Sequence, residues 1–345
     1  MKKILIANFG GIKDIMLSAP ALQALKKADP DSVLHMLIFP EPLEYAMMLS
    51  CIDNITVLQR ELVCLSSNLK LLFELRKEKF DIMINMRTLF TKKEASYIQW
   101  IINAVNPQLK VGRNTDGRGK FFDIKIPETS VGEKYEMEYN SDIVKALGVE
   151  EVGRDIDFPI DEKSQEYADD LLKREGIEEN MFLMGIHPGG GVLRRWSIDK
   201  LCEVIRELNK KFSFRYVITG SNDEKDLGEY IVKEIEEGRV IDLTGKLGMP
   251  SLGAVIKRCN LFVSNDAAPL HIAAVFKTPL IALFGSTDLT RYDPRNICDK
   301  AEIIYNKQDC APCKKSKCEA IKCMDSITIE SVVQACLKFI NPVQL

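Results

Sequence analysis

The most restrictive feature of the sequence is a repeated alternation of short apolar, β-branched runs with segments of helical periodicity. This alternation is typical of βα units, in which helices cover both faces of a parallel sheet. In the first half of the chain we predict strands over 3–7, 33–38, 55–58 and 81–85, and helices over 15–27 and 69–79. The fold class is therefore α/β.

A second α/β layer follows a polar helical stretch that begins after Pro159 and carries no strong apolar stripe. Strands are predicted over 182–187, 215–219, 240–243, 261–264 and 280–284, and helices over 196–211, 223–236, 251–257, 269–276 and 329–340. A chain of 345 residues exceeds the usual size of one core, although a single large barrel is an alternative. We predict two Rossmann-like domains, 1–160 and 161–345, facing a central cleft, with the final helix packing back on the first domain.

Charge and hydropathy limit the partners and the location of the protein. Lys and Arg total 47 against 50 Asp and Glu, so the basic excess typical of nucleic-acid binding is lacking. The first apolar run breaks at Gly10 and is followed by Lys13 and Asp14, which indicates a buried strand rather than a signal peptide. Since the sequence holds no apolar stretch long enough to span a bilayer, we expect a cytoplasmic protein, with peripheral contact at the inner membrane face as an open alternative.

The first strand-to-helix turn, residues 9–14, lacks the glycine spacing of a dinucleotide-binding motif. Its notable residue is Asp14, a carboxylate at the start of a predicted helix. Two interpretations are open. Asp14 caps the helix and complements its dipole, or it acts as a general base.

The turn after the strand at 182–187 combines His187 and Gly189 with Arg194 and Arg195. Glycines permit close approach of backbone N–H groups to an anion, and two guanidinium groups before a helix could bind a diphosphate. The alternative is a solvated basic loop with Trp196 packed in the core. His187 alone is more typical of a strand-end histidine than of a catalyst.

Two further turns carry polar residues that could face a ligand. In the turn at 219–224, Asp223 or Glu224 could accept hydrogen bonds from ribose hydroxyls, although helix capping explains Asn222 and Asp223 equally well. The turn at 264–271 has small residues that allow a ligand close to the backbone. A carboxylate near a phosphate is repelled, so Asp266 is expected to orient the loop or a sugar hydroxyl.

These turns occur together and in order, and together they resemble glycosyltransferase family 9, the ADP-heptose heptosyltransferases. The similar segments are 11–14 with 18–22, 187–189 with 195–196, and 264–274 followed by 279–285. The resemblance implies a GT-B fold, inversion at the anomeric carbon and no required metal or other cofactor. It also implies Asp14 as the base. The implied donor-binding residues are His187, Gly189, Arg194, Arg195, Glu224, Asp266, Ala267, Ala268, Pro269, Leu270 and His271.

The implied reaction moves a sugar, heptose from ADP-heptose, onto a hydroxyl of a lipopolysaccharide-core or related glycan acceptor. Two positions depart from the family pattern: Lys13 replaces the usual glycine before the base, and Ala267 with Ala268 replaces Ser or Thr followed by Gly. Two other functions therefore stay open. One is a sugar-nucleotide epimerase of GT-B architecture, and the other is a non-catalytic nucleotide-sugar-binding protein with a decayed site.

Ten cysteines fall into two groups. Cys310, Cys313, Cys318 and Cys323 lie close together in the sequence, which is compatible with a structural metal, with disulfide or redox pairing, or with free thiols. None of these alternatives makes the cluster the active site. The others lie in apolar patterns, where cysteine acts as a small hydrophobic residue; they are Cys51, Cys64, Cys202, Cys259, Cys298 and Cys336.

Overall fold

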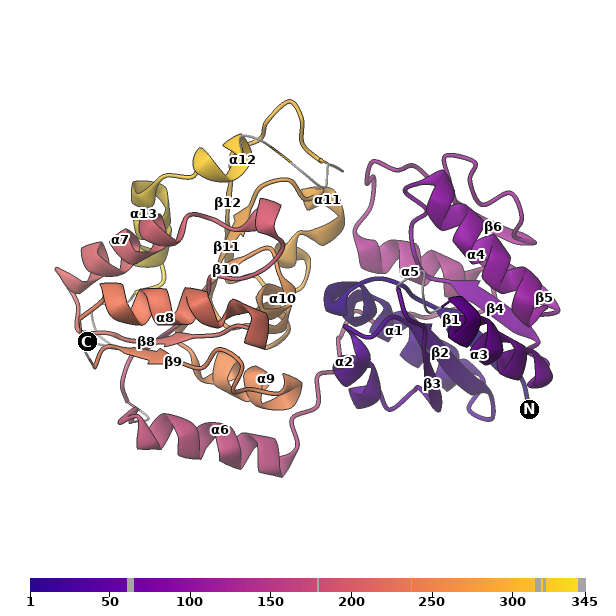
Figure 1. Cartoon of the computed structure of the whole chain (residues 1–345), viewed down its shortest axis with the longest axis horizontal. Helices are drawn as coiled ribbons and strands as arrows, with labels where there is room; N and C mark the ends of the chain where they lie inside the picture. The colour runs from indigo at the N-terminus through magenta and orange to yellow at the C-terminus, as the bar shows by residue number, and fades with distance from the viewer. Residues whose placement is uncertain (61–64, 179, 237, 314–317, 319–320, 341–345) are drawn as a thin grey trace. The chain divides into compact units, whose positions relative to one another are not determined.

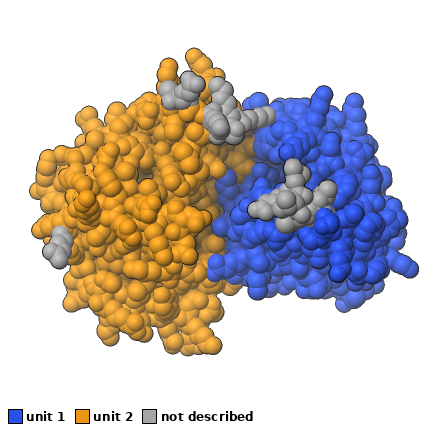
Figure 2. Space-filling model, in the orientation of Figure 1, with its two compact units in different colours: residues 1–157 blue, residues 158–345 orange. Residues whose placement is uncertain are grey.

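The computed structural model describes residues 1–60, 65–178, 180–236, 238–313, 318 and 321–340, so Cys64 lies outside the described residues. The chain forms two compact units, Met1–Asp157 and Phe158–Leu345, which Figure 2 shows in blue and orange. The polar helix expected near the domain boundary is α6 (Glu162–Arg174), which belongs to the second unit.

Unit 1 is a parallel six-stranded sheet with helices on both faces (Figure 1). Its strand order is β3-β2-β1-β4-β5-β6, the Rossmann arrangement, in which the order reverses between β1 and β4. Its strands are β1 (Lys3–Ala7), β2 (Val33–Ile38), β3 (Asn54–Val57), β4 (Ile82–Asn85), β5 (Leu109–Thr115) and β6 (Ile124–Glu128). Its helices are α1 (Ile12–Ala28), α2 (Leu43–Met48), α3 (Leu65–Lys77), α4 (Lys92–Val105) and α5 (Glu136–Lys145).

Unit 2 repeats this arrangement with the order β12-β11-β10-β7-β8-β9, which reverses between β7 and β10. Its strands are β7 (Leu183–His187), β8 (Arg215–Ile218), β9 (Val240–Asp242), β10 (Leu261–Asn265), β11 (Leu280–Phe284) and β12 (Ala301–Tyr305). Besides α6, its helices are α7 (Ile198–Asn209), α8 (Lys225–Glu234), α9 (Met249–Arg258), α10 (Ala268–Val275), α11 (Leu289–Tyr292), α12 (Lys322–Asp325) and α13 (Ile329–Leu337).

The expected α/β class with two parallel sheets is confirmed, and each predicted strand has a counterpart within a residue or two of its expected bounds. The fold adds β5, β6 and β12, which the apolar pattern did not indicate. The last helix, α13, contacts α7, β11 and β12 of its own unit. Its expected packing on the first domain stays a prediction.

One hydrophobic core of unit 2 lies between its sheet and the helices α7 and α13. Strand residues such as Met184 and Val263 pack there against Ile205, and the thiols of Cys202 and Cys336 lie among them. Burial raises the pKa of the Cys202 thiol to about 11 and that of Cys336 to about 12. Because only the thiolate is a strong nucleophile, these two cysteines act as small hydrophobic residues, as their pattern predicts.

Candidate active site

The first candidate site lies where the strand order of unit 1 reverses, in the turn from β1 to α1. Asp14 is the third residue of α1, and its carboxylate accepts the backbone N–H of Gly11 at 2.9 Å. A Cβ atom on Gly10 would lie 2.4 Å from the Cβ of Asp14, so the turn requires glycine at this position. Asn8 steadies the turn by accepting the N–H of Gly10 at 3.2 Å and donating to Ser18 at 3.3 Å. The capping role of Asp14 is therefore confirmed.

A second charged residue meets Asp14 from the neighbouring strand. Arg87 lies in the loop after β4, and its Nη1 is 2.9 Å from Oδ2 of Asp14. An opposite charge at this distance favours the ionised carboxylate, the form that a general base needs. Sequence reasoning missed Arg87. The signal available was its position just beyond a predicted strand, because the ends of β1 and β4 meet at the reversal of strand order.

Glu224 organises the second candidate site, in unit 2. Its Oε1 accepts the backbone N–H of Gly190 at 2.7 Å and lies 3.4 Å from Nη2 of Arg195, while its Oε2 accepts the N–H of Ser221 at 2.9 Å. A Cβ atom on Gly189 would lie 2.1 Å from Oε1, so only glycine lets the carboxylate reach this loop. Gly190 has φ +111°, a conformation that favours glycine.

The protonation state of Glu224 follows from these donors. Burial raises the pKa of its carboxyl, but the N–H groups of Ser221 and Gly190 stabilise the charged form and bring the pKa below its usual value. The negative carboxylate of Glu224 thus binds the N–H of Gly190 and the guanidinium of Arg195, two groups of the loop that the sequence predicts to bind an anion. These donors can bind a negatively charged group, and Glu224 can accept a hydrogen bond from a hydroxyl.

Asp266, at the end of β10, is the second acidic centre of this site. Its buried side chain lies 3.2 Å from Nη1 of Arg194 and accepts a hydrogen bond from the hydroxyl of Thr287, in the loop after β11. This bond places a hydroxyl beside the turn in which the chain has Ala267 and Ala268. Thr287 was not among the predicted residues, since its loop follows a different strand.

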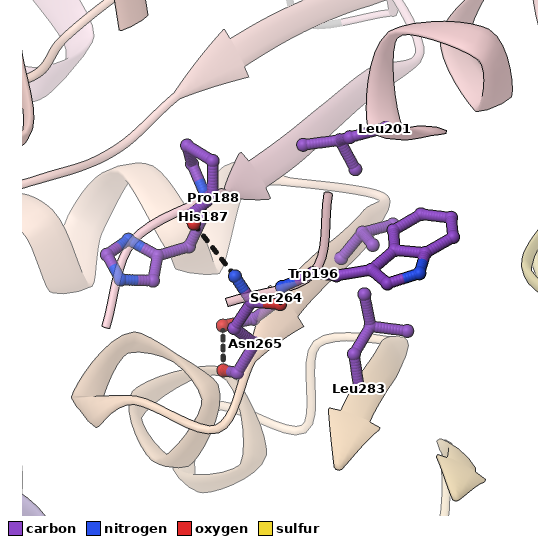
Figure 3. Close-up of a pocket in the computed structure, with 8 residues that line it drawn as sticks. His187, Pro188, Trp196, Leu201, Ser264, Asn265 and Leu283 are labelled. Atoms are coloured by element: carbon purple, nitrogen blue, oxygen red, sulfur yellow. Dashed lines mark hydrogen bonds between the residues drawn. The ribbon is translucent and has the colours of Figure 1, made fainter. Parts of the chain in front are cut away.

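The neighbouring Asn265, at the end of β10, holds the loop that follows β7, as Figure 3 shows. Its side-chain nitrogen donates to the carbonyl of Pro188 at 2.8 Å and to that of Gly189 at 3.1 Å, and its oxygen accepts the N–H of Trp196 at 3.1 Å. The loop that carries Arg194 and Arg195 is therefore fixed at both ends by one residue of β10.

A small pocket lies behind this loop, at the ends of β7, β10 and β11 (Figure 3). Its enclosed volume is about 10 Å³, room for about one water molecule and far too little for a nucleotide sugar. It is lined by His187, Pro188, Trp196, Leu201, Val263, Ser264, Asn265 and Leu283. Among these lining residues, His187 alone was a predicted donor-binding residue.

Other predicted donor residues face inward. Nδ1 of His187 lies 3.0 Å from the carbonyl of Thr219, and burial lowers the pKa of the ring, so His187 is a neutral strand-end histidine. Leu270 and His271 are buried in α10, with Nε2 of His271 3.9 Å from Asp266. Pro269 is also buried, whereas Ala267 and Ala268 are partly exposed. Donor contact by these residues stays a prediction.

The cysteine cluster does not fit a metal site. Cys310 and Cys318 are exposed, and Cys313 and Cys323 are partly buried. Over the described ranges, no three His, Cys, Asp or Glu side chains gather in a way that could hold a metal ion. The segment is nevertheless docked, because the N–H of Cys313 donates to the carbonyl of Ser286 at 2.8 Å. We assign no metal to these cysteines.

Two Rossmann-like units with these strand orders form the GT-B fold, which the solved structures of glycosyltransferases share. The model of "Glycosyltransferase family 9 (heptosyltransferase)" matches residues 68–324, and the chain belongs to this family. The expected family and GT-B fold are thereby confirmed.

Relatives and solved structures agree with this assignment. The chain is 26% identical to lipopolysaccharide heptosyltransferase 3 of Escherichia coli, over 80% of this chain and 81% of the relative. It is 25% identical to lipooligosaccharide heptosyltransferase 2 of Campylobacter jejuni, over 93% of each chain. A family 9 glycosyltransferase from Veillonella parvula superposes with a TM-score of 0.76 at 21% identity, covering 98% of this chain and 97% of that one. The ADP-heptose lipopolysaccharide heptosyltransferase II of E. coli gives 0.73 at 16% identity, covering 98% of each.

Proposed function

We propose that this protein transfers heptose from ADP-heptose, with inversion, onto a hydroxyl of a lipopolysaccharide-core or related glycan. The curated relatives, which match most of this chain, are heptosyltransferases of lipopolysaccharide or lipooligosaccharide. The observation that carries the proposal is the set of donors around Glu224. The N–H of Gly190 and the guanidinium of Arg195 converge on one negative group, as they would on a diphosphate.

The residues take the following roles in this proposal. Arg195, Arg194 and the N–H of Gly190 hold the donor diphosphate, while Glu224 accepts hydrogen bonds from the ribose. Asp266 with Thr287 orients the sugar hydroxyls. The amino terminus of α10 adds partial positive charge near the diphosphate, and its N-cap Ala267 makes no competing side-chain bond.

Asp14 is the proposed base. It takes the proton of the acceptor hydroxyl as that oxygen forms a bond to the anomeric carbon. The bond between the anomeric carbon and the diphosphate oxygen breaks, and its electron pair leaves with ADP, whose developing charge the unit 2 donors stabilise. Attack opposite to the leaving group inverts the anomeric configuration.

Calorimetric titration with ADP-heptose, a UDP-sugar and a GDP-sugar tests the donor site before any acceptor is chosen. We expect selective binding of the ADP-sugar. Arg195→Ala should weaken it about 10- to 100-fold, the usual effect of losing a hydrogen bond to a charged group. Arg174→Ala is the matched control, because this arginine is exposed on α6, and its ion pair spans 3.9 Å at the surface.

Two results would count against the proposal. Absence of binding to all three sugar nucleotides would reject a nucleotide-sugar transferase. Binding that Arg195→Ala and Arg174→Ala weaken equally would show that the loop after β7 does not hold the diphosphate. If ADP-heptose binds, release of ADP in the presence of a lipopolysaccharide-core acceptor separates the transferase from a non-catalytic binder.

We further propose that the protein works in peripheral contact with an anionic membrane surface, where lipid-linked acceptors lie. No helix of the described ranges has the length and hydropathy to cross a bilayer. Support comes from α3, where Phe73 is 48% exposed and lies between Lys70 and Lys77 on one helical face. An exposed aromatic ring flanked by cations is typical of interfacial helices.

Flotation with lipid vesicles tests this contact. Vesicles of phosphatidylcholine with phosphatidylglycerol should retain the protein, and Phe73→Ser should reduce the retained fraction more than Tyr230→Ser, which removes an exposed aromatic residue from unit 2. Equal retention by purely neutral vesicles, or no effect of Phe73→Ser, would contradict the proposed surface.

A further inference from the structure

A buried polar network in unit 1 supports the segments that carry the ion pair of Asp14 and Arg87. The centre of this network is Arg113 on β5, whose side chain is fully buried. Its guanidinium lies 3.2 Å from Glu128 and 2.6 Å from Glu136. A buried guanidinium bound on several sides is rigid, because each lost contact would leave a charge without compensation.

The network fixes the loop that carries Arg87. Nη1 of Arg113 donates to the hydroxyl of Thr88 at 3.1 Å, and that hydroxyl donates to Glu128 at 2.9 Å. The next residue is also held, since the N–H of Leu89 donates to Thr115 at 3.0 Å. On the other side, the buried Asn85 donates from its side chain to the carbonyl of Arg87 at 2.6 Å. The backbone of Arg87 is thus anchored at its own carbonyl and at the next two residues.

The same network reaches the helix that carries Asp14. Nη2 of Arg113 donates to Oδ1 of Asn140 on α5 at 2.5 Å, and the Asn140 amide donates to the carbonyl of Leu17 at 2.9 Å. Leu17 lies one turn after Asp14 on α1. The buried guanidinium of Arg113 therefore binds the residue next to Arg87 and, through Asn140, reaches the helix turn after Asp14.

We propose that Arg87 is a positioning residue for Asp14: it fixes the carboxylate in one orientation and holds it in the charged form that accepts the acceptor proton. This inference rests on the proposed function. Arg87 and the Gly11 N–H both bind Oδ2 of Asp14, at 2.9 Å each. Two donors on one oxygen restrict rotation of the carboxylate, and the cation opposes its protonation.

Other charged and titratable groups surround this pair. Lys13 precedes Asp14 on α1. Of the helices that pack against α1, α5 contributes Glu136, which is bound to Arg113, and α2 contributes Glu44 and Tyr45. Tyr45 donates its hydroxyl to the carbonyl of Asp157, and its pKa is raised by burial, so it stays neutral. Removing Arg87 is therefore expected to affect the protonation of Asp14 more than removing any of these other groups would, because Arg87 contacts its carboxylate directly.

The test compares Arg87→Met, Arg87→Lys and the control Arg76→Met, which removes an exposed arginine from the last turn of α3. The readouts are kcat/KM for heptose transfer against pH and the calorimetric Kd for ADP-heptose. We expect Arg87→Met to lower kcat at least tenfold and to move the acidic limb of the profile up by about one pH unit or more. Arg87→Lys should keep the limb near its wild-type position. The Kd for ADP-heptose should change less than twofold in every variant.

A purely structural role predicts a different pattern. In that case Arg87→Met would lower Tm and activity together and leave the acidic limb in place, which would overturn the proposal. Carboxyl ¹³C NMR adds a readout that does not require turnover, with the Asp14 resonance assigned from its loss in Asp14→Asn. A wild-type protein that transfers no heptose would refute the proposed function alone. An Asp14 titration unchanged by Arg87→Met would refute the role of Arg87.

Discussion

The two units have the same strand order, yet they place opposite charges at the same point of the fold. In unit 1 the segment after the first strand carries the anion, Asp14, and the loop after the fourth carries the cation, Arg87. In unit 2 the loop after the first strand carries Arg194, and the loop after the fourth begins at Asp266. Each pair spans the reversal of strand order. The comparison teaches that topology fixes where polar loops meet, whereas the residues on those loops decide the chemistry.

The degree of burial also differs between the pairs. Asp14 and Arg87 retain 10% and 27% of their side-chain exposure, whereas Asp266 is fully buried and Arg194 is 36% exposed. Unit 2 thus presents the cation outward and keeps the anion inside, which suits the binding of a negatively charged donor. Unit 1 leaves the carboxylate partly accessible, which suits proton transfer from a hydroxyl.

The largest expected effect comes from removing the proposed base. Asp14→Asn keeps the size of the side chain but cannot accept a proton, so kcat should fall about 10²- to 10⁴-fold. The Kd for ADP-heptose should stay within twofold, because the proposed donor-binding residues lie in unit 2. Steady-state kinetics with parallel calorimetry measure both. Equal losses in kcat and in donor affinity would contradict the proposal that unit 1 supplies the base and unit 2 binds the donor.

The next effect concerns stability, and it contrasts a buried ion pair with an exposed one. Arg113→Met leaves Glu128 and Glu136 buried without their cation and should lower the free energy of unfolding of unit 1 by about 3–5 kcal/mol. The matched change in unit 2, Arg206→Met, removes a surface pair to Glu203 and Glu234 and should cost less than about 1 kcal/mol.

Denaturant unfolding followed by tryptophan fluorescence separates the two units. The sequence holds two tryptophans, Trp100 in unit 1 and Trp196 in unit 2, so a Trp→Phe change at either one leaves a reporter for the other. A smaller loss for Arg113→Met than for Arg206→Met would contradict the structural role of the buried network.

A third effect sharpens the assignment of Glu224. Glu224→Gln loses the charge that the N–H groups of Gly190 and Ser221 stabilise, and the ribose loses a charged acceptor. Affinity for ADP-heptose should fall about 10- to 100-fold. Asp223→Asn, an exposed neighbour, is the control in the same calorimetric series. Tighter binding by Glu224→Gln would mean that this carboxylate competes with the donor phosphates rather than contacting the ribose.

The smallest effect is a pH dependence of stability that both units share. His187 in unit 2 and His35 in unit 1 each have a pKa lowered chiefly by burial. The unfolded chain therefore binds protons at a pH where the folded chain does not, and stability falls as pH drops below about 6.5. His187→Asn should flatten this slope for the Trp196 signal only, and His35→Gln for the Trp100 signal only. Each slope is at most about 1.4 kcal/mol per pH unit. Unaltered slopes would show that the two histidines take up protons equally in both states.

Much of this architecture could be predicted from the sequence, because buried parallel strands leave continuous apolar runs such as 261–264 and 280–284. The run at 109–115 gave no such signal. It carries Lys110, Arg113 and Asn114, so β5 has no continuous apolar run, and its polar residues include the centre of the buried network. Strand β12 was also missed. It is an edge strand, and its side chains after Ala301 are only partly buried.

The site was partly predictable on the same grounds. Residues that follow one strand closely, such as Gly189 with Arg195, were found because a short turn holds them together in sequence. Arg87 and Thr287 lie on other loops, and only the order of the strands brings them to Asp14 and Asp266. A prediction that had fixed the strand order first, and then searched the residues after the fourth and fifth strands of each unit, could have found both.

The anchoring of Trp196 has a consequence for the timing of assembly during synthesis. Its indole N–H donates to the carbonyl of Ile327 at 3.1 Å, and Lys200 donates to the carbonyl of Asp325 at 2.7 Å. The basic loop is therefore held by a segment that lies 131 positions after Trp196 in the chain. Unit 1 contains all six strands of its own sheet and can fold while unit 2 is still being translated. The loop after β7 reaches its final form only after residues 325–327 have been translated, so a nascent chain can pair Asp14 with Arg87 before the proposed donor loop is held in place.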